Sequence, residues 1–201
     1  MMSLLHVMTP SLAKAILILG AVSWFAIRLP HQRRSWKTKT RVNARTTREK
    51  ILLSCSFTGL GVVPFFYVAS GRPRFADYEF QPLLAWLGLF VFLGSLWLFY
   101  RVHRELGRNW SDSLEVREQH TLVTGGLYKY VRHPMYSAFF LWAVAQLLLL
   151  PNWIAGPAGL VGFGTLYLFR VGQEEKLMLS TFGDAYRAYM QRTARIVPWV
   201  M

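Results

Sequence analysis

The chain has 201 residues and a formal net charge of +13, yet 53% of its residues are hydrophobic and only 16% are charged. So apolar a chain is neither a disordered basic tail nor a soluble nucleic-acid-binding domain, and we expect no nucleic-acid partner. Its single cysteine excludes a disulfide framework, and its length allows one domain or two small ones. The positions of the charges therefore decide the class of protein.

Three long apolar runs occupy the first half of the chain. They cover residues 11–27, 51–70 and 83–100, and Lys14 is the only charged residue within them. The hydrocarbon core of a bilayer takes roughly 20 apolar residues in a helix, so all three runs are predicted to be transmembrane helices.

The basic residues are concentrated in one connecting stretch. Residues 28–50 carry nine basic side chains and a single acid, Glu49. The positive-inside rule therefore predicts that this stretch is a cytoplasmic loop, that the N-terminus lies outside, and that 71–81 is a short outer turn. Residues 101–133 and the tail from Arg170 then lie in the cytoplasm.

Two shorter apolar runs follow, at residues 137–150 and 154–169, with Pro151-Asn152-Trp153 between them as a tight turn. They predict a helical hairpin in the membrane, although runs of this length leave open whether the hairpin spans the bilayer fully. The predicted fold class is an all-α integral membrane protein with about five transmembrane helices and a C-terminal helical hairpin. Little chain remains for a soluble domain, so any chemistry must come from the loop and the tail.

The loop ends in an unusual polar motif, HTLVTGGLYKYVRHPMY, at residues 120–136. Pro134 disfavours the α conformation for the residue before it, so the next helix is expected to begin at Pro134. This arrangement places Arg132, His133 and Tyr136 at the membrane boundary, close to the start of a helix.

The tail carries a second polar motif, RVGQEEKLMLSTFGDAYRAYM, at residues 170–190. If the helix continues past the apolar run, Arg170 and Glu174 lie on one face, and Gly183 is expected to end the helix. Taken alone, such a pair indicates a surface ion pair. The histidines lack metal-ligand spacing, so we expect no metal, and no phosphate-binding or dinucleotide motif is present.

Together the two motifs resemble the isoprenylcysteine carboxyl methyltransferase family, including its prokaryotic relatives. Residues 120–136 fit the family pattern H-x-L-V-x-x-G-x-Y-x-x-x-R-H-P-x-Y, and residues 170–190 resemble R-x-x-x-E-E-x-x-L-x-x-x-F-G-x-x-Y-x-x-Y. The sequence ARIVP at 194–198 is similar to the usual end of the prokaryotic members. The first 100 residues match in layout only, and Ser137-Ala138 departs from a common glycine, which predicts slightly altered packing.

The resemblance implies an integral-membrane methyltransferase that uses S-adenosylmethionine. Arg170 is then placed at the methyl acceptor, with Glu174 as its catalytic partner. The resemblance and the chemistry of the side chains together assign nine residues to the cofactor pocket: His120, Thr121, Leu122, Val123, Tyr128, Arg132, His133, Tyr136 and Glu174. Residues 1–100 become three transmembrane helices with the basic loop. Residues 101–201 become the catalytic region, which consists of a cofactor loop (101–135), a helical hairpin (136–169) and a cytoplasmic tail (170–201).

The acceptor is expected to be a lipid-tailed or amphiphilic molecule reached from membrane lipid. A carboxylate, with an ordinary pKa of about 3.5, is already ionised at neutral pH and needs only orientation, which Arg170 can supply. An amine acceptor would need Glu174 or Glu175 as a base. Methylation of an isoprenylcysteine-like carboxylate is therefore favoured. The alternatives are an N- or S-methyltransferase acting on a lipid headgroup or small amphiphile, a membrane reductase with a nicotinamide cofactor, and a non-catalytic lipid-binding protein.

Overall fold

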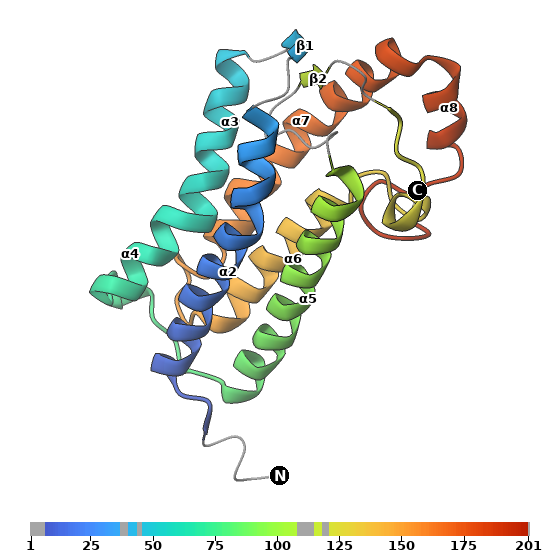
Figure 1. Ribbon diagram of the computed structural model, residues 1–201. Helices are drawn as coiled ribbons and strands as arrows, with labels where there is room; N and C mark the ends of the chain where they lie inside the picture. The colour runs from blue at the N-terminus through green and yellow to red at the C-terminus, as the bar shows by residue number, and fades with distance from the viewer. Residues whose placement is uncertain (1–6, 37–39, 44–45, 108–114, 118–120, 201) are drawn as a thin grey trace.

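The structure is a computed structural model that describes residues 7–36, 40–43, 46–107, 115–117 and 121–200. Helices make up most of it (Figure 1). The main helices are α2 (Pro10–Trp36), α3 (Thr47–Phe57), α4 (Val63–Ser70), α5 (Pro82–Leu106), α6 (Pro134–Leu149), α7 (Ala158–Phe182) and α8 (Asp184–Met190). A π-helical segment, η1 (Thr58–Val62), joins α3 to α4, and two 3₁₀ turns are η2 (Arg74–Ala76) and η4 (Gly126–Lys129).

Among the described residues, three helical stretches are long and apolar enough to cross a membrane: Pro10–Arg33, Thr47–Ser70 and Pro82–Leu106. Helix α6 is shorter and also apolar. Large hydrophobic side chains such as Leu19 and Phe90 are mostly exposed, as expected for helices that face lipid. The predicted helical membrane fold is thereby confirmed, whereas the number of spans and their orientation stay predictions.

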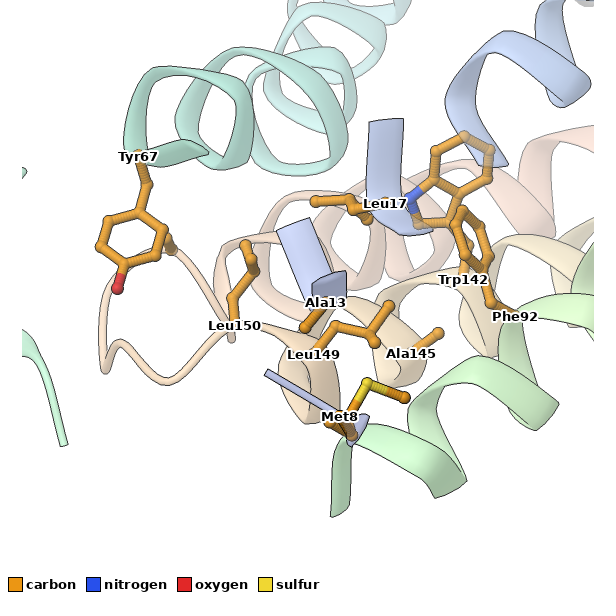
Figure 2. Packing of buried hydrophobic residues seen from close by; sticks show 11 residues of the cluster. Met8, Ala13, Leu17, Tyr67, Phe92, Trp142, Ala145, Leu149 and Leu150 are labelled. Atoms are coloured by element: carbon orange, nitrogen blue, oxygen red, sulfur yellow. The ribbon is translucent and has the colours of Figure 1, made fainter. Parts of the chain in front are cut away.

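Helices α2, α5 and α6 share one hydrophobic cluster (Figure 2). Leu17 of α2, Phe92 of α5 and Trp142 of α6 meet there, and the Phe92 and Trp142 rings lie 5.0 Å apart in an edge-to-face arrangement. Helix α2 therefore packs mainly on α5, although α3 follows it in the chain.

Helix α3 and the π-helical segment pack on α7 instead, through glycines. A Cβ atom added to Gly59 would lie 2.2 Å from the carbonyl oxygen of Ala158, and one added to Gly162 would lie 2.5 Å from that of Cys55. Such close approach of backbones is typical of helix packing in membranes, where small residues form the interface. The side-chain amide of Gln146 in α6 donates to the carbonyl of Gly59 at 3.1 Å, which joins α6 to the same contact.

The basic stretch 28–50 is less of a loop than predicted. Helix α2 continues to Trp36, and α3 begins at Thr47, whose preceding residue Thr46 caps the helix by accepting a hydrogen bond from the Glu49 amide at 3.2 Å. Arginine and glutamine favour helices, so α2 does not end where its apolar run ends.

A two-stranded antiparallel sheet was also not expected in this region. Strand β1 (Thr40–Asn43) pairs with β2 (Glu115–Arg117), with Val42 opposite Val116. The pairing ties the connection after α2 to the connection after α5. Both strands lie at the same end of the bundle as α8, opposite the start of α2 (Figure 1).

Candidate active site

The two polar motifs come together at this end of the bundle. The loop before α6 runs beside the tail after α8: the amides of Arg132 and His133 donate to the carbonyls of Ala194 and Arg195, both at 2.9 Å. Pro134 begins α6 and Gly183, with φ of +54°, ends α7, both as predicted. The segment that follows α8 is therefore part of the site's framework, because it fixes the loop backbone just before the helix.

Glu174 lies at the centre of the predicted site residues. The Tyr136 hydroxyl donates to its Oε2 at 2.7 Å, the His133 Nδ1 is 3.7 Å from its Oε1, and the Arg170 Nε is 3.9 Å from its Oε2. Burial alone would raise the pKa of this carboxyl, but the hydrogen bond and charge of His133, the charge of Arg170 and the hydroxyl of Tyr136 outweigh it and lower the pKa to about 2.

Glu175, its neighbour in the chain, has a different set of partners. Its carboxylate accepts from the Arg132 Nε at 2.8 Å and the Arg195 Nη2 at 2.9 Å, and lies 3.4 Å from the His133 Nε2. Burial raises the pKa of Glu175, but these hydrogen bonds outweigh it and lower the pKa to about 2. Conversely, burial lowers the pKa of His133, but the two carboxylates on either side of its ring raise it above its ordinary value.

Arg132 was predicted to hold the cofactor, and the structure gives its guanidinium other partners. Besides Glu175, it donates to the carbonyls of Met190 and Thr193 in the tail. Arg132 also borders the central cavity, so a cofactor contact stays a prediction. The interactions that the structure does show join the loop to the tail.

The predicted cofactor loop is held from two sides. The Tyr189 hydroxyl of α8 donates to the carbonyl of Tyr128 at 2.6 Å, and Glu105 of α5 accepts from the Leu127 amide at 2.8 Å. Gly126 has φ of +61°, and a Cβ atom there would lie 2.5 Å from the Glu105 carboxylate, so the turn requires glycine. Glu105 is thus a supporting residue that the sequence reasoning missed.

A cavity of about 640 Å³ joins this polar cluster to the interior of the bundle. At its polar end, all but one of the predicted cofactor and acceptor residues line it: Thr121, Leu122, Val123, Tyr128, Arg132, His133, Tyr136, Arg170 and Glu174. His120 is the exception, because it lies outside the described residues.

The other end of the cavity is apolar and runs between α2 and the α3–α4 helix. We call this part the apolar arm; its walls include Ala21, Trp24, Phe25, Phe57, Leu60, Gly61 and Phe65. It exists because α2 packs on α5 while α3 packs on α7, so these two helices, consecutive in the chain, diverge. Phe25 and Phe57 are 55% and 69% exposed, so the arm opens toward the surface that faces lipid.

Glu49 is a further site residue that the sequence reasoning missed. It is only 3% exposed, and its Oε1 lies 3.5 Å from the Nη2 of Arg170. A single acidic residue in a strongly basic stretch is usually predicted to be part of a solvated loop. The available signal was Thr46-Thr47-Arg48-Glu49, a helix-start pattern that places Glu49 in the first turn of α3.

The fold and the site define a class: a helical membrane protein with a partly enclosed ionic site at one end of the bundle, continuous with an apolar chamber between helices. Residues 86–180 match the sequence model of the isoprenylcysteine carboxyl methyltransferase (ICMT) family. This match confirms the resemblance that was based on the two motifs.

Curated relatives carry the corresponding name. The chain is 36% identical over 96 residues to protein-S-isoprenylcysteine O-methyltransferase B of Arabidopsis thaliana, which covers 47% of the chain and 49% of the relative. It is 33% identical over 90 residues to the Dictyostelium discoideum protein-S-isoprenylcysteine O-methyltransferase, covering 43% of the chain and 36% of the relative. The matches thus span half or less of these relatives' own length.

A solved structure is similar over a larger part of the chain. The eukaryotic intramembrane Ras methyltransferase ICMT superimposes with a TM-score of 0.53 and 25% sequence identity, over 80% of this chain and 55% of that one. The similarity in structure thus extends beyond the segment that matches in sequence.

Proposed function

We propose that this protein is an S-adenosylmethionine-dependent membrane methyltransferase that esterifies the carboxylate of an isoprenylcysteine-like, lipid-tailed acceptor. The observation that carries the proposal is one continuous cavity, which joins the cluster around Glu174 to the apolar arm. A water-soluble donor and a lipid-tailed acceptor can meet only in a space that has both kinds of wall. The basic stretch 28–50 lies toward the same end of the bundle, and by the positive-inside rule it favours a site on the cytoplasmic side.

The polar end fits the donor by the chemistry of its groups. Backbone groups of Thr121–Val123 can bind the edge of adenine, and the rings of Tyr128 and Tyr136 border the same space. The Glu174 carboxylate, ionised because its pKa is about 2, offers a negative charge to a cationic ligand. When bound, S-adenosylmethionine supplies an electrophilic methyl group.

The acceptor end is organised around Arg170. Arg170 lines the same cavity as the apolar arm, so it can hold a carboxylate while the attached lipid tail lies among Trp24, Phe57 and Leu60. One carboxylate oxygen forms the new bond to the methyl carbon as the bond from that carbon to the donor sulfur breaks. The residues contribute by placing the two reactants in line, which can account for a large share of the rate.

The acidic residues of the site favour a carboxylate acceptor over an amine. An amine must lose a proton before or during methyl transfer, and a base works best when its pKa is near the working pH. The pKa values of Glu174 and Glu175 are both lowered to about 2, so neither carboxylate is suited to accept that proton. A carboxylate needs no such base.

Binding calorimetry of the purified protein in detergent tests the class of cofactor. We expect S-adenosylhomocysteine to bind and NADPH not to bind. Binding of NADPH without binding of S-adenosylhomocysteine would refute the methyltransferase proposal and favour a reductase. Binding of neither ligand would also count against it.

A further inference from the structure

We propose that Glu49 is a positioning residue for the acceptor: it occupies one edge of the Arg170 guanidinium and so limits how strongly Arg170 binds the acceptor carboxylate. This inference rests on the proposed function and adds a residue from the first half of the chain, outside the segment that matches the family.

The burial of Glu49 requires an explanation. It sits in the first turn of α3 at the boundary of the membrane region, yet it is 3% exposed, and a buried carboxylate is costly unless a cation or hydrogen bonds compensate it. Arg170 supplies a cation, which reaches Glu49 from α7 across the interface that contains Gly59 and Gly162.

Two carboxylates flank the Arg170 guanidinium from different sides. Glu49 faces its Nη2 at 3.5 Å, and Glu174 faces its Nε at 3.9 Å. Both distances are longer than the 2.8 Å between Arg132 and Glu175. Arg170 is thus shared between two acids at moderate distance, whereas Arg132 is held by close contacts that suit a structural role.

This sharing has a consequence for a carboxylate nucleophile. A guanidinium that is free to grip a carboxylate with two parallel hydrogen bonds binds it tightly, and the same bonds withdraw charge from the oxygen that must attack. Glu49 competes with the acceptor carboxylate for the Arg170 guanidinium, so the acceptor makes a weaker contact that is not bidentate. The acceptor is therefore bound less tightly in the ground state but keeps its nucleophilicity.

The test is steady-state kinetics of methyl transfer to N-acetyl-S-farnesylcysteine by Glu49→Gln, which keeps the shape and removes the charge. We expect KM for the acceptor to fall about 3- to 10-fold and kcat to fall by a similar factor, the pattern of a relieved ground-state destabilisation. The affinity for S-adenosylhomocysteine should stay within about twofold, since Arg170 rather than the donor end is affected. An unchanged or raised KM would overturn the inference.

Ligand binding separates this role from a purely structural one. Glu49→Gln should raise the affinity for the acid N-acetyl-S-farnesylcysteine and leave the affinity for its methyl ester unchanged, because the ester has no carboxylate for Arg170 to bind. Equal changes for acid and ester would contradict the inference.

Two control variants address the fold. Thr46→Ala removes the helix cap beside Glu49 and should lower Tm without lowering KM; if it reproduces the kinetics of Glu49→Gln, the cap explains them and the inference is wrong. Glu79→Gln changes an exposed acid elsewhere and should have no effect on the kinetics.

If Glu49→Gln does not fold, Glu49→Asp is the deciding variant. We expect it to lower KM for the acceptor by a smaller factor, and an unchanged KM would contradict the inference. Absence of any transfer by the wild type would instead refute the proposed function.

Discussion

Neighbouring acidic residues in the tail motif have separate tasks. Glu174 lines the cavity beside Tyr136 and Arg170, whereas Glu175 is 4% exposed and joins Arg132 of the loop to Arg195 of the tail. The helix turns by about 100° per residue, so adjacent side chains point in different directions. One carboxylate therefore remains at the cavity, while the other joins the loop to the tail around it.

The role of Glu174 predicts a charge-dependent loss of donor binding. Glu174→Gln should weaken S-adenosylmethionine, whose sulfonium is a cation, by about 10- to 100-fold, the value of a hydrogen bond or contact to a charged group. Neutral-sulfur S-adenosylhomocysteine should lose less. Calorimetry with both ligands measures this difference, and equal losses would show that the carboxylate does not respond to the sulfonium.

Acid sensitivity follows from the same pair of residues. The folded-state pKa values of Glu174 and Glu175 are about 2, below the ordinary value of 4.5, so their stabilisation is complete above pH 4.5 and is lost as the pH falls toward 2. Each pKa unit is worth about 1.4 kcal/mol, so over that window we expect a loss of several kcal/mol and a Tm lower by roughly 10 °C or more.

Thermal unfolding in detergent at several pH values measures this loss, with Glu175→Gln as the reference. That variant should start less stable at neutral pH and should change less on acidification. A wild-type Tm that falls no more steeply than that of the variant would contradict the assignment of the pKa values.

Among the helices, the glycine contact between α3–η1 and α7 sets the position of Glu49 on α3 relative to Arg170 on α7. Gly162→Ala puts a Cβ atom 2.5 Å from the Cys55 carbonyl, whereas Gly164→Ala, one half-turn further on, meets nothing within 4 Å. The first change should destabilise the protein by about 1–3 kcal/mol through overpacking, and the second should be neutral or stabilise the helix.

Thermal unfolding of both variants measures this difference in stability, and methyl-transfer assays measure its effect on the site. Gly162→Ala should also alter acceptor kinetics, because a shift of α3 moves Glu49 relative to Arg170. Equal stability of the two alanine variants would show that α3 and α7 do not meet at this glycine.

The sequence predicts local features of the elements well. Pro134 and Gly183 act on the backbone next to them, so the start of α6 and the end of α7 could be placed from the residues themselves. The meeting of the two motifs was predicted from the family resemblance. The structure places their described residues around one cavity, and their individual roles stay predictions.

What could not be predicted depends on contacts between distant segments. The pairing of β1 with β2 joins two connections separated by the whole of α3–α5, and no local pattern specifies it. Glu49 and Arg132 are polar residues whose partners come from other elements, so the type of residue did not indicate which partner each would have. The apolar arm likewise arises from the packing of α2 on a different helix from α3.

For the whole molecule, the apolar arm predicts selectivity for lipid-tailed acceptors. Gly61→Leu would fill part of the arm, and we expect KM for N-acetyl-S-farnesylcysteine to rise by about 10-fold or more, since the tail would lose several buried CH₂ contacts. The affinity for S-adenosylhomocysteine should not change. Gly94→Leu, on α5 outside the arm and with nothing within 4 Å, is the matched control. Similar kinetics of the two leucine variants would contradict a tail in the arm.

We propose that one cavity brings a methyl donor to a lipid-tailed carboxylate. The most direct test follows transfer of a labelled methyl group from S-adenosylmethionine to N-acetyl-S-farnesylcysteine and to phosphatidylethanolamine, with wild type and Arg170→Ala. We predict a base-labile methyl ester on the farnesylcysteine with the wild type and no turnover with Arg170→Ala, which should still bind S-adenosylhomocysteine. Label found on the lipid amine and absent from the carboxylate would contradict the account.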